Sequence, residues 1–260
     1  MRVKACICTD IGNTRDINQD SALIKVANTK NHGRISLIAV CDGMGGLSKG
    51  EVASCKAIRT LESWFHEELS MLQNLTENEL WDAVESSFDR MIRRINGDLR
   101  RYGKHRNLNL GTTLTAFLQI GNKYISVNIG DSRIYAVRAK EVERLTKDQS
   151  LVQDKLDRGL ITEREVFSDA EKSVLLQCLG TSHAPNPEVR KGVLKDNTTI
   201  IACSDGFWRT LGAEDIRKKL CPQMCLTDED MLNQCKKLVE KAKSRDEEDN
   251  ITIAAACFEM

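Results

Sequence analysis

The sequence has no excess of charge of either sign, because 38 lysines and arginines balance 38 aspartates and glutamates. A protein that grips nucleic acid or an anionic membrane is usually basic overall. The balance therefore speaks against both partners. The local basic pairs Arg93-Arg94 and Arg100-Arg101 recur at helical spacing, and we interpret them as a solvated helix face.

Long apolar runs are also missing. No stretch approaches the ~20 residues of a membrane span, and the apolar part of "MRVKACICTD" is too short for a signal peptide. There is no repeat, no low-complexity segment and no linker rich in Pro or Ser. We therefore expect residues 1–260 to form one domain of a soluble, cytoplasmic, monomeric protein.

The ten cysteines lack the paired CxxC spacing of a structural zinc site. The closest pairs are Cys6 and Cys8, with one residue between them, and Cys221 and Cys225, with three residues between them. Five cysteines stand inside apolar runs and are expected to be small buried hydrophobes, namely Cys6, Cys8, Cys41, Cys203 and Cys257. Free thiols indicate a reducing compartment.

Short runs rich in Val, Ile and Thr alternate with two longer amphipathic stretches. The runs predict strands at 3–9, 21–27, 34–41, 112–120, 123–129, 133–138, 198–203 and 250–258. Apolar residues at i, i+3 and i+4 predict helices at 50–69, 77–103, 213–220 and 228–243. The Gly-Asn pair in "IGNKY" predicts a hairpin. The order favours neighbouring antiparallel strands with helices in pairs.

One stretch, "AVCDGMGGLSKGEVAS" (39–54), ends an apolar run on Asp42, and four of the next eight residues are glycine. The pattern resembles a dinucleotide-binding turn, but that fold needs a strand directly after the helix, and a second helix is predicted here. It is not a P-loop either, because Lys49 precedes Gly50 instead of following it. Nucleotide binding is therefore not favoured.

Other acids recur where predicted strands meet loops: Asp20, Asp131, Asp205 and Asp249. Each alone is compatible with an ordinary turn, where Asp is common. If the strand ends converge, the carboxylates repel each other, and they must take up protons or share a cation. Carboxylate oxygens without His or Cys select Mg²⁺ or Mn²⁺.

The order of these motifs resembles the metal-dependent protein phosphatases, the PPM or protein phosphatase 2C family, in its bacterial form. The resemblance extends over about residues 5–258. It rests on "TDIGNTRDINQDS" (9–21), "AVCDGMGG" (39–46), "GTTLTAFL" (111–118), "IGDSRIYAVR" (129–138), "LTKDQS" (145–150), "LGT" (179–181), "CSDGFW" (203–208) and "DEEDNITI" (246–253).

The resemblance implies an α+β fold, a four-layer α-β-β-α sandwich of two antiparallel sheets flanked by helix pairs. It implies two Mg²⁺ or Mn²⁺ ions, with a third held more weakly. By motif, the metal ligands are Asp42, bridging two ions, the Gly43 carbonyl, Asp205, Asp249, Asp20 through water, and Asp131 at the third ion. The glycines after Asp42 are expected to let metal and phosphate come close.

The implied chemistry is attack of a metal-activated water on phosphorus, without a phosphoenzyme. Arg15 matches the residue that grips the substrate phosphate, for which a planar guanidinium suits better than lysine. The alternative for Arg15 is a surface ion pair with Asp16 or Asp20. Asp42 and Arg15 are thus the candidate catalytic residues.

The chain departs from the family pattern at three positions. Met44 stands where many eukaryotic members have a histidine that protonates the leaving group, so metal-bound water is the expected proton source. Gln19 replaces a glutamate and Gln149 replaces a histidine. The four histidines, His32, His66, His105 and His183, lie outside the motifs, and residues 150–171 match an exposed flap beside the site.

The favoured function is hydrolysis of phosphoserine and phosphothreonine in proteins, in signalling opposite a bacterial Ser/Thr kinase. The expected partners are a phosphorylated protein, either such a kinase or its targets. Two alternatives remain: a catalytically silent relative that only binds partners, and a hydrolase of small phosphomonoesters.

Overall fold

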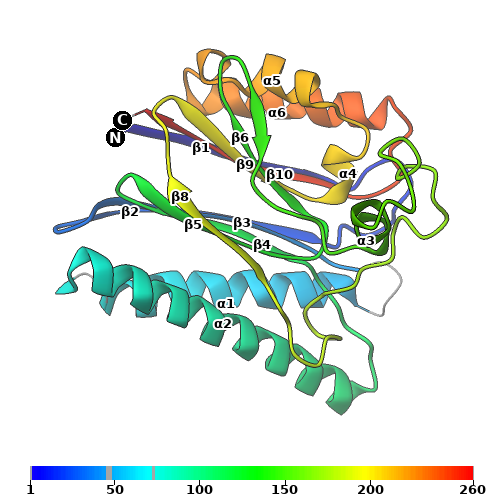
Figure 1. Ribbon diagram of the computed structural model, residues 1–260, viewed down its shortest axis with the longest axis horizontal. Coiled ribbons are helices and arrows are strands. Elements are labelled where there is room, and N and C mark those ends of the chain that lie inside the picture. The colour runs from blue at the N-terminus through cyan, green and yellow to red at the C-terminus, as the bar shows by residue number, and fades with distance from the viewer. Residues whose placement is uncertain (1, 45–48, 72–73, 260) are drawn as a thin grey trace.

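The computed structural model describes residues 2–44, 49–71 and 74–259. Two five-stranded sheets lie face to face, and helices cover both outer faces (Figure 1). All recorded strand pairs are antiparallel. The predicted four-layer sandwich is confirmed.

The strands of each sheet come from distant parts of the chain. The first sheet has the order β1 (Arg2–Asp10), β10 (Ile251–Glu259), β9 (Thr198–Cys203), β6 (Arg133–Val137) and β7 (Val142–Arg144). The second has the order β2 (Asp20–Thr29), β3 (Gly33–Asp42), β4 (Leu114–Ile120), β5 (Lys123–Ile129) and β8 (Glu188–Val193). The predicted hairpin joins β4 to β5, with Gly121 in a positive-φ conformation.

The long helices occupy the predicted stretches and lie on opposite sides of the sandwich (Figure 1). Helices α1 (Gly50–Met71) and α2 (Glu77–Arg106) cover the second sheet, and α5 (Ala213–Leu220) and α6 (Asp228–Lys243) cover the first. The shorter elements α3 (Leu151–Asp157), α4 (Asp205–Trp208) and η2 (Pro222–Met224) were not predicted. Helix α3 lies at one end of the sandwich.

Strand β3 shows why the core extends up to the site. Its alternate residues Leu37 and Ala39 pack toward α1 and α2, whereas Ile38 and Val40 pack between the sheets. Because both faces are covered, the strand reads as a continuous apolar run rather than an alternating one. Asp42 is the last residue of this strand, where the core ends.

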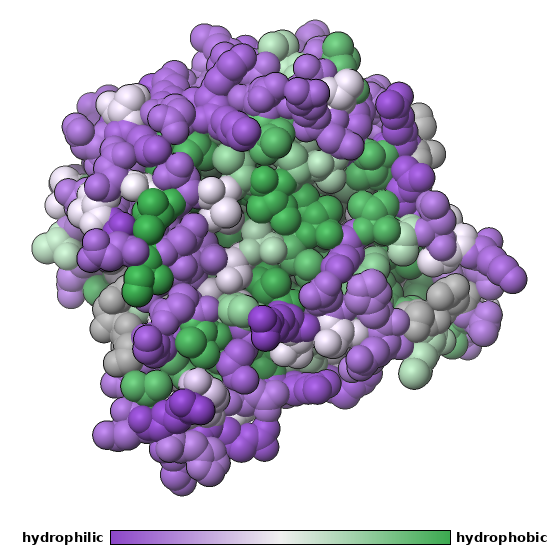
Figure 2. Space-filling view, turned by 180° about the vertical axis from the view of Figure 1, so that it is seen from behind, coloured by the Kyte–Doolittle hydropathy of each residue, from purple (hydrophilic) through white to green (hydrophobic). Residues whose placement is uncertain are grey.

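The edge strands β1 and β2 leave the flank of the sandwich partly open. Val3, Ala5, Ala22 and Ile24 pack against the core between the sheets but stay partly exposed. Seen from behind, the molecule has a hydrophobic area framed by hydrophilic residues (Figure 2). In the described part of the chain, no helix combines the length and hydrophobicity needed to cross a bilayer.

All ten cysteines are free. Cys41, Cys203 and Cys257 are buried, as predicted. The prediction was wrong for Cys6 and Cys8, which are only partly buried. Both lie on β1, which has a neighbouring strand on one side only, so the open edge leaves them partly accessible.

Candidate active site

The predicted acids meet at one end of the sandwich. Asp20 and Asp42 are register partners at the ends of β2 and β3. Asp205 follows β9, and Asp249 precedes β10. These two strands are neighbours in the first sheet, whereas β2 and β3 belong to the second. Asp131 precedes β6, whose Arg133 pairs with the last residue of β9. The sheet topology therefore brings five separate turns together.

The glycines after Asp42 and Asp205 serve close backbone packing. A Cβ on Gly43 would stand 2.4 Å from the Gly50 carbonyl oxygen and 2.6 Å from that of Gln19. A Cβ on Gly206 would stand 2.3 Å from the Asn250 oxygen. The space beside both glycines is thus filled by protein backbone, which corrects the expectation that Gly43 leaves room for a ligand. The glycine pair at 45–46 lies outside the described residues.

The carboxyls of Asp20 and Asp42 share a crowded, poorly solvated position. Both residues keep some exposure, but the surrounding protein desolvates their carboxyls. Desolvation raises the pKa of Asp20 to about 7, although the Ser204 hydroxyl donates a hydrogen bond of 2.8 Å to its Oδ2. Desolvation, and then the charge of Asp20, raise the pKa of Asp42 well above its usual value. A cation would relieve this repulsion.

Asp205 and Asp131 are the most buried acids of the site, and both face Arg209. Desolvation raises the pKa of Asp205, and it raises that of Asp131 to about 8, while Arg209 opposes both shifts. The Arg209 Nη2 lies 2.5 Å from Asp205 Oδ2 and 3.7 Å from Asp131 Oδ2. The sequence reasoning missed Arg209, although its place four residues after Asp205 is the spacing of one helical turn.

Arg15 stands at the rim of the acid cluster. Its Nη2 donates a hydrogen bond of 2.9 Å to Asp249 Oδ2. The alternative interpretation of Arg15, a surface ion pair with Asp16 or Asp20, was wrong, because Arg15 pairs with Asp249. The side chain of Arg15 keeps 44% exposure, so the guanidinium can reach a ligand without leaving the site.

Asn250, a residue that the sequence reasoning missed, holds the loop that carries Arg15. Its side-chain amide donates to the carbonyls of Ile11 (2.9 Å) and Ile17 (3.1 Å). Its Oδ1 accepts from the Gln19 amide at 2.9 Å. One buried asparagine thus fixes both ends of the segment around Arg15. Gln19 itself donates to Glu51 at 3.4 Å.

A second layer of contacts supports Asp131. Arg133 makes three hydrogen bonds of 2.6–3.1 Å to the carboxylate of Asp148, and its guanidinium lies 3.3 Å from the centre of the Trp208 ring. The indole of Trp208 donates to the Asp131 carbonyl at 3.0 Å. Gln149, which replaces the family histidine, accepts from the Gly130 amide at 3.2 Å and donates to the Asn186 carbonyl.

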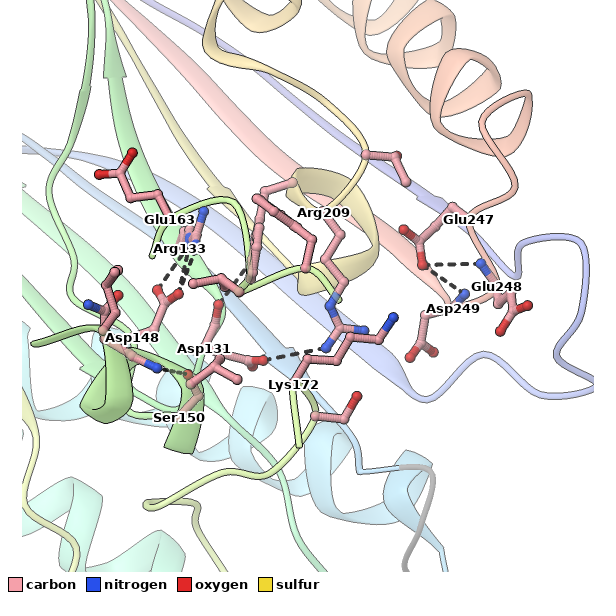
Figure 3. Close-up of a pocket in the computed structure, with 18 of the residues that line it drawn as sticks. Asp131, Arg133, Asp148, Ser150, Glu163, Lys172, Arg209, Glu247, Glu248 and Asp249 are labelled. Carbon is pink, nitrogen blue, oxygen red and sulfur yellow. Dashed lines mark hydrogen bonds and ion pairs between the residues drawn. The ribbon is translucent and has the colours of Figure 1, made fainter. Parts of the chain in front are cut away.

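A pocket of about 690 Å³ opens beside these residues (Figure 3). Arg15, Asp131, Arg209 and Asp249 line one part of it. The predicted flap lines another part with α3 and with residues 163–173, in which Phe167 is exposed. Asp20, Asp42, Asp205 and the four histidines are not among the lining residues.

The donor set suits a hard divalent cation. In the described ranges, no three His, Cys, Asp or Glu side chains are grouped closely enough to hold a metal as they stand. Arg15 and Arg209 engage Asp249 and Asp205 instead. However, Asp205 Oδ1 is buried and makes no hydrogen bond to any described residue, and all five acids offer oxygen. The residues therefore fit Mg²⁺ or Mn²⁺ once the exposed Arg15 releases Asp249.

Comparison with known proteins agrees with this geometry. The family model described as "Protein phosphatase 2C" matches residues 13–240. The serine/threonine phosphatase stp of Listeria innocua is 29% identical over 247 residues, which are 94% of this chain and 92% of that protein.

Two solved structures resemble the whole chain. Serine/threonine phosphatase Stp1 from Staphylococcus aureus has a TM-score of 0.84 and 28% identity, and covers 100% of this chain and 96% of its own. The catalytic domain of the phosphatase PstP, solved in complex with 2 manganese ions, has a TM-score of 0.77 and 28% identity, with 99% of both chains covered.

Proposed function

Since the chain belongs to the protein phosphatase 2C family, we propose that it hydrolyses phosphoserine and phosphothreonine in proteins with Mg²⁺ or Mn²⁺ as cofactor. The family model and the bacterial relatives support the reaction. The manganese in the PstP structure supports the metal. Phosphoproteins made by a Ser/Thr kinase are the substrates that this reaction requires.

Two cations would be held by the acids at the sandwich end. The residues that would hold them are Asp42, the Gly43 carbonyl, Asp20, Asp205 and Asp249. When bound, the cations supply Lewis-acid activation of water and charge neutralisation at phosphorus. The raised pKa values of Asp20 and Asp42 support this assignment, because desolvation and the neighbouring carboxylates disfavour the charged forms of both groups, and a cation would offset this.

Arg15 would bind the substrate phosphate. Its guanidinium stands at the pocket rim beside Asp249 and is partly exposed. A planar guanidinium can donate two parallel hydrogen bonds to phosphate oxygens, which both orients the phosphoryl group and stabilises its charge. Asn250 would keep this contact in place by fixing the loop on both sides of Arg15.

The pocket beyond Arg15 has room for the peptide that carries the phosphate. Its lining also includes the apolar Val166 and Phe167 and the cationic Lys172 and Arg144. Such a lining suits the residues that flank a phosphorylated side chain more than it suits a small phosphomonoester alone. This favours a protein substrate.

The observation that carries the proposal is that five acids lie at strand ends on one end of the sandwich, beside an exposed arginine. The direct test measures turnover of p-nitrophenyl phosphate and of a phosphothreonine peptide, with Mn²⁺ and with EDTA. We expect turnover of both that depends on Mn²⁺, with the larger kcat/KM for the peptide. No turnover would favour a silent relative, and efficient turnover of the small ester alone would favour a small-molecule hydrolase.

A further inference from the structure

The guanidinium of Arg209 lies where two buried carboxylates need a positive charge. Its guanidinium lies against two acids at once, 2.5 Å from Asp205 and 3.7 Å from Asp131 between Nη2 and the nearer carboxylate oxygens. Figure 3 draws the contact with Asp131 as a dashed line. The side chain is only 19% exposed, so the guanidinium is largely enclosed by the protein.

The backbone fixes Arg209 in this place. Its amide donates to the Asp205 carbonyl at 2.9 Å, which ends the short helix α4. Asp205 and Arg209 are therefore one helical turn apart and on the same face. The preceding Trp208 is held in turn by its contacts with Asp131 and Arg133.

The other arginines that line the pocket have partners of their own. Arg133 is the neighbouring candidate, but its guanidinium is bound by three hydrogen bonds to Asp148 and lies on the Trp208 ring. Arg144 also pairs with Asp148, at 3.7 Å. Arg15 pairs with Asp249. Among the ion pairs of the described residues, Asp131 is recorded only with Arg209.

We infer that Arg209 supplies the positive charge at Asp131 that the family resemblance assigns to a third metal ion, so that the chain holds two divalent cations. A divalent cation at Asp131 would stand next to a guanidinium that cannot lose its proton. The inference rests on the proposed function, since it counts ions in the same site.

Arg209 and the two remaining ions can coexist. Asp205 gives only Oδ2 to Arg209, and its Oδ1 makes no hydrogen bond to a described residue. One oxygen of Asp205 is thus available to a cation while the other keeps the guanidinium. Asp131, by contrast, has its nearest counter-ion in Arg209 and no need of a metal.

The test counts bound Mn²⁺ by equilibrium dialysis at millimolar Mn²⁺, with metal quantified by mass spectrometry. The variants are Asp131→Asn, Arg209→Gln, Arg209→Lys and the double variant Arg209→Gln/Asp131→Asn. We expect two ions in the wild type, in Asp131→Asn and in Arg209→Lys. We expect a third, weaker ion in Arg209→Gln, and its loss in the double variant.

Three ions in the wild type, one of them lost in Asp131→Asn, would overturn the inference and leave the proposed function standing. A third ion missing from folded Arg209→Gln would also overturn it. Absence of any Mn²⁺ binding by the wild type would instead contradict the proposed function. If Arg209→Gln fails to fold, the comparison of wild type with Asp131→Asn still decides the count.

Discussion

The guanidinium of Arg15 and the carboxylate of Asp249 form an ion pair across the active-site rim, 2.9 Å between Nη2 and Oδ2. The same arginine is the proposed phosphate ligand, and the same aspartate is a proposed metal ligand. In the structure each side chain therefore satisfies the other. Binding of metal and phosphate would separate them, and both side chains keep enough exposure for this exchange.

Arg15→Lys keeps the charge but loses the planar fork. We expect kcat/KM on a phosphothreonine peptide to fall about ten- to a hundredfold, as for the loss of one charge-assisted contact of roughly 1.5–3 kcal/mol. Arg15→Ala should be worse. Its Mn²⁺ affinity should rise slightly, by less than about tenfold, because Asp249 loses an exposed competitor worth ~0–1 kcal/mol.

Arg93 is the matched control for Arg15. It forms an ion pair with Asp89, 2.7 Å apart and more exposed than the pair of Arg15, on the surface of α2. Arg93→Ala should leave kcat, KM and Mn²⁺ affinity unchanged. Wild-type kinetics in Arg15→Ala at saturating Mn²⁺ would rule out the phosphate-binding role.

Asn250→Ala should both destabilise the protein and disorganise the Arg15 loop. Three hydrogen bonds would be lost, so we expect the free energy of unfolding to fall by about 2–4 kcal/mol. KM for the peptide should rise. Asn96 is the control, because it is also buried but lies outside the Arg15 loop. It donates a hydrogen bond to the Ser182 carbonyl and accepts one from the Gly180 amide. Asn96→Ala should destabilise the fold without raising KM; equal effects on KM would contradict the role of Asn250.

The raised pKa of Asp20 predicts how metal-free stability depends on pH. The folded protein holds a proton on Asp20 up to about pH 7, whereas the unfolded chain loses it near 3.8. The folded state therefore binds more protons between these values, and this stabilisation is lost as the pH rises from about 4 to about 7. In EDTA, the free energy of unfolding of the wild type, measured with urea, should fall over this pH range. The fall should be shallower for Asp20→Asn.

The same protons compete with metal. Mn²⁺ affinity of the wild type should rise from pH 6 to pH 8, as the carboxyl of Asp20 gives up its proton. Calorimetry in buffers of different ionisation enthalpy should record proton release on Mn²⁺ binding.

Parallel pH profiles of stability for wild type and Asp20→Asn would refute the assignment of the proton to Asp20.

Two glycines test the packing of the site with opposite expected signs. Gly43→Ala places a Cβ 2.4 Å from the Gly50 carbonyl oxygen and should cost about 1–3 kcal/mol of stability and most of the activity. Gly97→Ala, inside α2, meets no atom within 4 Å and should stabilise the protein by roughly 0.5–1 kcal/mol. Thermal unfolding measures both. A neutral Gly43→Ala would show that the backbone at Asp42 can yield.

The longer elements that bury an apolar face could be predicted from the sequence, and the short or exposed ones could not. Helices α5 and α6 occupy the predicted ranges because their apolar spacing is regular. Strand β8 was not predicted, because it lies at a sheet edge and its central residues Arg190 and Lys191 are exposed and charged. Strand β7 has only three residues, too few for a pattern.

The acids of the site could be predicted because each ends or precedes a recognisable strand. Arg209 and Asn250 could not, since what they do depends on distant partners. Asn250 bonds Ile11 and Ile17, more than 230 positions earlier. Arg209 neutralises Asp131, which belongs to another strand end. Only the folded chain brings these pairs together.

The central claim is that the converging acids hold the cations that drive phosphate hydrolysis, and Asp42→Asn tests it most directly. This change removes one carboxylate charge at the centre of the cluster with little change of shape. Asp89→Asn, on the exposed face of α2, is the control and should keep full activity. The measurement is Mn²⁺-dependent phosphate release from a phosphothreonine peptide by folded protein. The account predicts that Asp42→Asn abolishes it, and undiminished phosphate release by that variant would contradict the account.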